Sequence, residues 1–118
     1  MKTSKITIKY SKELDKLKKM LEKSGIECRM HYDFDIGMTR LRVYLSGDRY
    51  LSAISGKYAL GDEKGLLEIS GGLTDEEWVE CGGRKGDRFS ATMGWLTAQE
   101  VFERFKYCKE HNTLRYVA

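Results

Sequence analysis

The first residues that could do chemistry are four lysines, spaced to form a single positive stripe. They lie three or four positions apart, so on a helix they fall within one narrow face. This lysine stripe consists of Lys12, Lys16, Lys19 and Lys23. No acidic residue lies inside it, and a phosphate backbone would relieve the repulsion among its charges. The alternative is an ordinary solvated helix face that keeps the protein soluble.

A glycine-rich loop carries a second group of positive charges. Residues 82–88, here called the basic loop, read Gly-Gly-Arg-Lys-Gly-Asp-Arg. Successive backbone N–H groups in such a loop can form an anion-binding nest, with charge from Arg84, Lys85 and Arg88. The segment lacks the lysine-serine ending and the following helix of a nucleotide P-loop, so that class is excluded. The alternative is a mobile solvent loop.

Negative charge is concentrated between residues 61 and 80, which carry seven acids and one lysine. Six of these acids form what we call the acidic window: Asp62, Glu63, Asp75, Glu76, Glu77 and Glu80. Acids in the first turn of a helix interact favourably with its positive end, which explains part of the cluster. The remainder could face a basic groove on a partner protein and imitate a phosphate track.

Two Cys-x-x-His pairs have a spacing that suggests zinc, at residues 28–31 and 108–111. On a strand, residues three apart point to opposite faces, so Cys28 and His31 cannot bind the same ion. Cys108 falls on the apolar stripe of a helix, where a thiol behaves as a small hydrophobic group. We therefore expect neither a metal nor a cofactor.

Catalytic signatures are missing from the sequence. His31 has no nucleophilic Ser or Cys at a recognisable spacing, and there is no Gly-x-Ser-x-Gly turn. Asp33 and Asp35 share a strand face, but arginines expected opposite them would keep both carboxylates ionised. We therefore expect a protein that is not an enzyme.

Hydrophobic periodicity predicts the elements that position these groups. Residues 5–10 alternate between polar and apolar, which predicts a half-buried strand. Ser11 is suited to cap a helix that ends at Gly25. Residues 26–36 alternate strictly, with even positions apolar and odd positions polar, so they predict a second strand with one face in the core.

The register of the following hairpin depends on its loop. A two-residue loop at 37–38 would place apolar residues opposite one another on the core face. On the outer face it would place Asp35 opposite Arg40 and Asp33 opposite Arg42. Opposite charges across strands attract, so we assign both arginines to ion pairs rather than to nucleic acid.

The second half of the chain predicts two helices. A similar loop at 47–48 adds a third strand to the hairpin, with Leu45 opposite Tyr50. Residues 73–78 and 96–101 both read as a capping box inside a hydrophobic staple, so each predicts a helix start. The later helix is expected to run to about His111, and residues 113–117 are suited to a short last strand.

The order of elements predicts an α+β fold. We expect an antiparallel sheet, built as strand, helix and three-strand meander, with two or three helices packed on one face. The chain of 118 residues, 41% of them hydrophobic and 33% charged, fits a single domain over residues 1–118.

Composition also predicts a compartment. No apolar run approaches the roughly 20 residues of a membrane span, and the N-terminus has no apolar signal core. Three scattered cysteines suit a reducing environment better than a disulfide framework. We expect an intracellular protein without a membrane partner; the residues do not predict an oligomeric state.

Three segments, 65–69, 73–78 and 94–105, together resemble a pattern in small uncharacterised phage and prophage proteins of Firmicutes. The resemblance covers about the last half of the chain and implies a viral or mobile-element origin, which would place the protein in the cytoplasm of a host cell. It implies no binding residues, and residues 81–93 are longer than the pattern.

Two functions follow as expectations. Small phage proteins without catalytic motifs often occupy the surface of a host machine, so the resemblance implies a binding protein that inhibits a host defence nuclease or nucleoprotein, of the anti-CRISPR kind. Either the acidic window, or the lysine stripe together with the basic loop, would supply charge complementarity. The alternative is a small basic accessory protein that binds nucleic acid directly.

Overall fold

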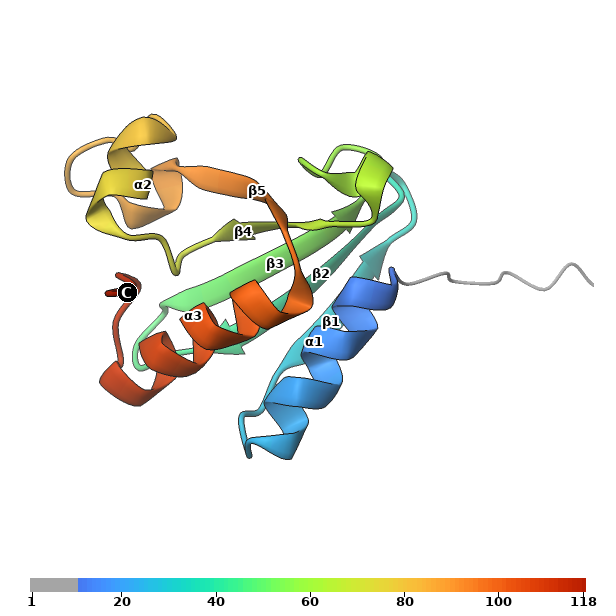
Figure 1. Ribbon diagram of the computed structural model, residues 1–118, viewed down its shortest axis with the longest axis horizontal. Coiled ribbons are helices and arrows are strands. Elements are labelled where there is room, and N and C mark those ends of the chain that lie inside the picture. Colours follow the sequence, from blue (N-terminus) through green and yellow to red (C-terminus); the bar gives the residue numbers. More distant parts are fainter. Residues whose placement is uncertain (1–10) are drawn as a thin grey trace, which may run out of the picture.

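The computed structural model describes residues 11–118, and its centre is a five-stranded antiparallel sheet. The strands lie in the sheet in chain order, so each pairs with its neighbour in the sequence (Figure 1). They are β1 (Arg29–Asp33), β2 (Met38–Tyr44), β3 (Tyr50–Gly56), β4 (Leu67–Ser70) and β5 (Thr92–Leu96). Together with the helices, this confirms the predicted α+β class.

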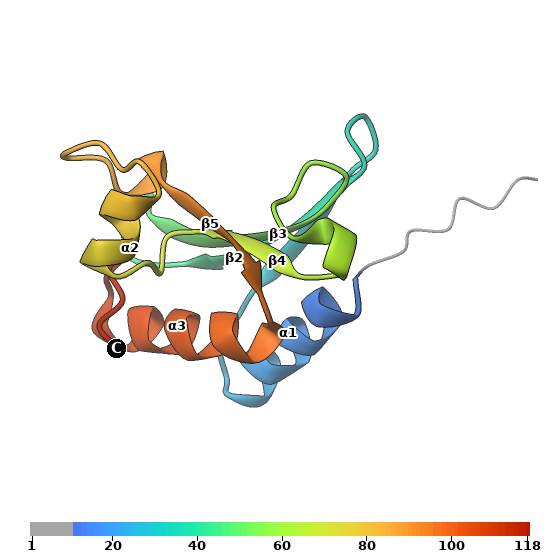
Figure 2. The same ribbon diagram turned by 45° about the horizontal axis from the view of Figure 1, so that its top comes forward.

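Three α-helices and two 3₁₀ turns accompany the sheet. They are α1 (Lys12–Lys23), η1 (Asp62–Lys64), α2 (Asp75–Glu80), η2 (Arg88–Ser90) and α3 (Ala98–His111). Helices α1 and α3 lie side by side on one face of the sheet, as predicted, whereas α2 and η1 lie toward opposite ends (Figures 1 and 2). No helix of residues 11–118 is long and apolar enough to cross a bilayer.

The helix starts follow the predicted caps. The Ser11 side chain accepts a hydrogen bond from the Leu14 N–H at 3.0 Å, and Thr74 and Thr97 each begin a complete capping box. Each cap satisfies backbone donors that a helix start would leave unpaired, a contribution of about 1 kcal/mol. Helix α3 ends at Asn112, whose φ of 51° lies in the left-handed region.

The core lies between the sheet and the two long helices. Seven side chains of α1 and α3 are buried in the core: Leu14, Leu17, Leu21, Ala98, Val101, Phe105 and Cys108. They meet inward-facing residues of β2, β3 and β4, such as Leu41, Leu51 and Ile69. Because each buried apolar side chain of this size contributes roughly 1.5–3 kcal/mol, this layer fixes which face of the sheet the helices cover.

The first hairpin has a longer turn than predicted. Asp33 pairs with Met38, so four residues, 34–37, form the turn. The Asp33 carboxylate accepts a hydrogen bond from the Asp35 N–H at 3.0 Å, and Gly37 closes the turn with a φ of 65°. An aspartate that hydrogen-bonds its own backbone two residues on favours this wider turn.

The longer turn changes what faces the two arginines of β2. Arg40 pairs with His31, and Arg42 pairs with Arg29. The predicted ion pairs with the two aspartates are therefore wrong. The turn also exposes Phe34, which the alternation had placed in the core and which is 61% exposed.

The second hairpin is also shifted. Tyr44, not Leu45, pairs with Tyr50, so the connection is longer than the predicted two-residue loop. Arg49 holds this connection by donating hydrogen bonds to the Ser46 carbonyl and to the Asn112 carbonyl. The anchor on the end of α3 is a contact distant in sequence, which local turn rules do not contain.

Two predicted strands have different outcomes. The strand over 5–10 lies outside the described residues. Residues 113–117 form only an isolated bridge, between Leu73 and Arg115. Strands β4 and β5 were not predicted from the sequence.

Candidate functional site

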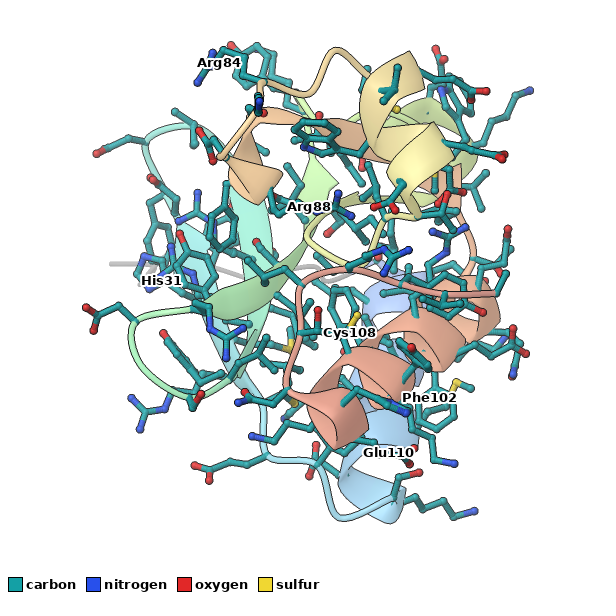
Figure 3. The ribbon with its side chains drawn as sticks, turned by 90° about the vertical axis from the view of Figure 1, so that its left-hand side faces the viewer. His31, Arg84, Arg88, Phe102, Cys108 and Glu110 are labelled. Atoms are coloured by element: carbon teal, nitrogen blue, oxygen red, sulfur yellow. The ribbon has the colours of Figure 1, made fainter. Side chains whose placement is uncertain are left out.

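The face of the sheet away from α1 and α3, here called the open face, presents side chains in cross-strand rows. One row consists of Arg29, Arg42, Ser52, Ser70 and Thr92. The next row consists of His31, Arg40, Ile54 and Glu68. Tyr44 and Tyr50 form a short row beside the first. In Figure 3, His31 lies on this open side of the sheet and Cys108 on the helix side.

The three arginines of the open face have no acidic partner among residues 11–118. All 18 carboxylate side chains of the sequence lie within the described residues, and none forms an ion pair with Arg29, Arg40 or Arg42. The Nε atom of Arg42 is buried and has no hydrogen-bond partner in residues 11–118. A buried donor without a partner costs about 1–3 kcal/mol.

Aromatic rings hold two of these arginines in place. The Arg42 guanidinium carbon lies 4.4 Å from the centre of the Tyr50 ring, and that of Arg29 lies 5.6 Å from the Tyr44 ring. Phe89 extends the aromatic surface, with its ring centre 5.1 Å from that of Tyr50. Cation–π contacts orient the guanidinium groups and leave their N–H donors available.

Two of the hollows on or beside the open face contain Arg40 and Arg42, whereas a third, of about 280 Å³, is lined by Glu27, Arg29, Tyr44 and Lys109. The larger of the first two, which we call the groove, has a volume of about 310 Å³. Its lining includes Arg40, Arg42, Tyr50, Ser52, Glu68 and Phe89. The smaller hollow, of about 230 Å³, lies over β1 and β2 and also includes Arg40 and Arg42. The two arginines therefore line both hollows, and an extended anionic ligand could occupy both at once.

Three carboxylates lie on or beside the open face: backbone donors engage Glu68 and Asp33, and Glu27 lines a hollow with Arg29 and Tyr44. Glu68 Oε1 accepts a hydrogen bond from the Leu60 N–H at 2.7 Å, while the Asp33 carboxylate is engaged by the turn. Glu68 is two strands away from Arg40, with Ile54 between them. The groove is thus positive on the β2 side and acidic on the β4 side.

The structure places the lysine stripe on the opposite side of the molecule. All four lysines are exposed on α1, whose buried leucines face the sheet. Only Lys16 has an acidic neighbour in residues 11–118, with its Nζ 3.8 Å from Glu13 Oε1. The stripe and the open face therefore cannot contact one short ligand together (Figure 2).

The basic loop adjoins the groove, but acids compensate most of its charge. Arg84 lies 3.3 Å from Asp87, and Arg88 lies 3.1 Å from Asp75. Lys85 is exposed and has no ion pair with the described residues. The loop leads directly into Phe89, which lines the groove, so it lies near the open face while the lysine stripe does not.

The acidic window is partly neutralised within the protein. Asp75 contacts Arg88 and also Arg115, at 2.8 Å. Glu77 forms a two-pronged pair with Arg104, at 2.6 and 2.7 Å. The hydrogen bonds from Arg104 lower the pKa of Glu77 to about 2. These two acids anchor the last residues, the basic loop and α3, which explains their presence without a partner protein.

The other four acids of the acidic window do not lie together on one surface. Asp62 accepts a hydrogen bond from the Gly56 N–H at 2.9 Å and so closes the loop before η1. Glu63, Glu76 and Glu80 are exposed and make no ion pair within residues 11–118. They lie on η1 and α2, which are at opposite ends of the sheet (Figure 1).

The cysteine and histidine pairs have the predicted orientations. Cys28 packs against the core, whereas His31 is exposed on the open face. Cys108 is fully buried, and burial raises its pKa to about 12. Residues 11–118 contain no cluster of three or more potential metal ligands.

Sequence reasoning missed the open face as a site because it relied on the wrong turn. The predicted ion pairs had removed Arg40 and Arg42 from consideration. The available signal was the alternation itself, since Arg29 and His31 on β1 point to the same side as the two arginines on β2.

Comparison with protein-family models, with curated proteins and with solved structures finds no match for this chain.

Proposed function

We propose that this protein binds nucleic acid directly, through the open face of its sheet. The observation that carries the proposal is the set of three arginines, Arg29, Arg40 and Arg42, which lie on adjacent strands and form no ion pair with a carboxylate of the described residues. Unpaired like charges repel one another, and a phosphate backbone supplies the negative charge that they lack.

The neighbouring side chains favour a nucleic acid over a simple anion. Tyr44, Tyr50 and Phe89 lie among the arginines. Positive side chains interleaved with aromatic rings are the composition of surfaces that track a phosphate backbone and stack its bases. A free phosphate or sulfate would use the charges but not the rings.

Inhibition of a host defence nuclease or nucleoprotein stays a prediction. Its acidic version needs a free carboxylate surface, yet Asp75 and Glu77 are engaged by arginines of this same chain. Its basic version needs the lysine stripe and the basic loop on one face, and they lie at opposite ends of the molecule (Figure 1). The geometry therefore favours direct binding of nucleic acid.

Oligonucleotide binding with two matched variants tests the proposal. The variant R40Q/R42Q removes two charges from the open face, and K12Q/K19Q removes two charges from α1. Fluorescence anisotropy with a labelled single-stranded 20-mer, over a series of salt concentrations, gives the affinity and its salt slope. We expect R40Q/R42Q to lose roughly 10- to 100-fold in affinity and to flatten the slope by about 2.

The control has the same net charge but a different position. We expect K12Q/K19Q to bind within about threefold of the wild type, since only long-range attraction changes. Absence of salt-dependent binding by the wild type would contradict the proposal. Equal losses in the two variants would show that net charge alone drives association, and would also contradict it.

A further inference from the structure

We infer that the groove receives one unpaired base that carries an exocyclic amino group, such as cytosine or adenine, with Glu68 as its hydrogen-bond acceptor. This inference rests on the proposed function and names the part of the nucleic acid that the site recognises. It follows from three features of the groove: its size, its aromatic wall and its single carboxylate.

The size of the groove suits a small ligand group. Its volume of about 310 Å³ lies at the lower end of the roughly 300–1,000 Å³ that is usual for small-molecule pockets. A double helix presents its bases stacked and paired, so inserting one into the hollow would cost a few kcal/mol of unpairing and unstacking. A single strand can turn a base out of its stack and into the groove.

The aromatic wall offers a stacking surface. Tyr50 and Phe89 line the groove and contact each other at 5.1 Å between ring centres. Both side chains are only partly buried. Since every base has a flat aromatic face, stacking on this wall would add affinity without selecting among bases.

Selection among bases would come from Glu68. One of its oxygens already accepts the Leu60 N–H at 2.7 Å, and the other accepts no hydrogen bond from residues 11–118. A carboxylate accepts hydrogen bonds and donates none when ionised. It therefore favours the amino groups of cytosine and adenine and disfavours the carbonyl oxygen that thymine presents at the same position.

The positions of Arg40 and Glu68 on two sides of the groove would orient a bound nucleotide. Arg40 and Glu68 lie in one cross-strand row, separated by Ile54. Neighbouring strands are about 4.8 Å apart, so the two positions are separated by roughly 10 Å. This spacing allows the phosphate of a nucleotide to contact Arg40 or Arg42 while the amino group of its base reaches Glu68.

Binding of labelled 12-mers of dC, dA and dT tests the inference. For the wild type we expect oligo(dC) and oligo(dA) to bind about 5- to 100-fold more tightly than oligo(dT). The variant E68Q keeps the shape and the acceptor for Leu60, but its amide can also donate to a carbonyl. We expect E68Q to bind oligo(dT) more tightly than the wild type does, and to discriminate less than about threefold.

A second variant tests the aromatic wall without changing Glu68. F89L removes part of the stacking wall, and we expect it to weaken binding of all three oligonucleotides by at least about fivefold. Circular dichroism verifies that each variant folds. If the wild type binds all three homopolymers equally, or if E68Q retains the discrimination, the inference is wrong while salt-dependent binding through Arg40 and Arg42 still stands. If no oligonucleotide binds, both the proposed binding of nucleic acid and the recognition of a base by Glu68 are wrong.

Discussion

Two regions of this molecule use arginine in opposite ways. Around α2, four arginines each lie within 3.3 Å of a carboxylate oxygen: Arg84, Arg88, Arg104 and Arg115. On the open face, three arginines have no carboxylate partner in the described part of the chain: Arg29, Arg40 and Arg42. The same side chain therefore stabilises the fold in one region and is available to a ligand in the other.

The difference shows that local charge density is a poor guide to binding. The basic loop and the acidic window are the most conspicuous charged segments of the sequence, yet Arg84, Arg88, Asp75 and Glu77 are all engaged in ion pairs within this chain. The open face has fewer charges, spread over two strands. What distinguishes it is the absence of acidic partners among residues 11–118, which only the strand register determines.

Giving Arg40 a carboxylate partner should lower the affinity for nucleic acid most strongly. Ile54 lies opposite Arg40 on the open face and is partly exposed, so I54E would give that arginine a cross-strand partner. We expect an affinity for single-stranded DNA roughly 100-fold lower than that of the wild type, because the substitution adds one negative charge and neutralises the positive charge of Arg40. The variant I54Q, of similar size without the charge, should stay within about threefold, and an equal loss in both variants would contradict the role of Arg40.

The packing of the basic loop provides a test in the α2 region. A methyl group added at Gly83 would overlap the Trp78 indole, which also donates a hydrogen bond to the Asp87 carbonyl at 3.2 Å. We therefore expect G83A to lower the free energy of unfolding by about 1–3 kcal/mol, as measured by urea denaturation. In a W78L background the same change should cost less. A G83A variant as stable as the wild type would indicate a mobile loop that is not packed on Trp78.

A smaller effect is expected from the ion pair between Glu77 and Arg104. The pKa of Glu77 is lowered to about 2 in the folded protein from an ordinary 4.5, so its contribution to stability is complete above about pH 5 and is lost as the pH falls toward 2. We expect E77Q to be less stable than the wild type by about 1–2 kcal/mol at pH 7, after allowance for partial exposure.

The pH dependence of thermal unfolding measures this contribution. The difference between wild type and E77Q should shrink between pH 5 and pH 2 and be nearly absent at the lower limit. The neighbouring variant E76Q serves as the control, since Glu76 is exposed and makes no ion pair in the described residues. A constant difference across this range would exclude the ion pair as its cause.

Local sequence signals predicted the helices well. The capping residues Ser11, Thr74 and Thr97 lie where the helices begin, because a cap depends only on residues within one turn. The alternation in β1 and β2 also placed the correct side chains on each face, since a shift of the register by an even number of residues keeps the faces unchanged.

The contacts distant in sequence could not be predicted. Arg49 anchors the second hairpin to Asn112 at the end of α3, and no local rule links residues so far apart. The wider first turn is stabilised by the hydrogen bond from the Asp35 N–H to the Asp33 carboxylate. The wider turn and a two-residue turn differ little in free energy. The length of this turn decides whether Arg40 and Arg42 lie opposite the two aspartates or have no acidic partner in the described residues.

The central claim is that the open face, rather than the lysine-bearing helix, contacts nucleic acid. The most direct test is a titration of the ¹⁵N-labelled protein with a single-stranded 12-mer of dC, followed by backbone amide chemical shifts. We expect the largest shifts in β1, β2 and β3, at residues 29–31, 40–44 and 50–54, with little change in 12–23. Largest shifts along residues 12–23, with the strands unchanged, would contradict the claim.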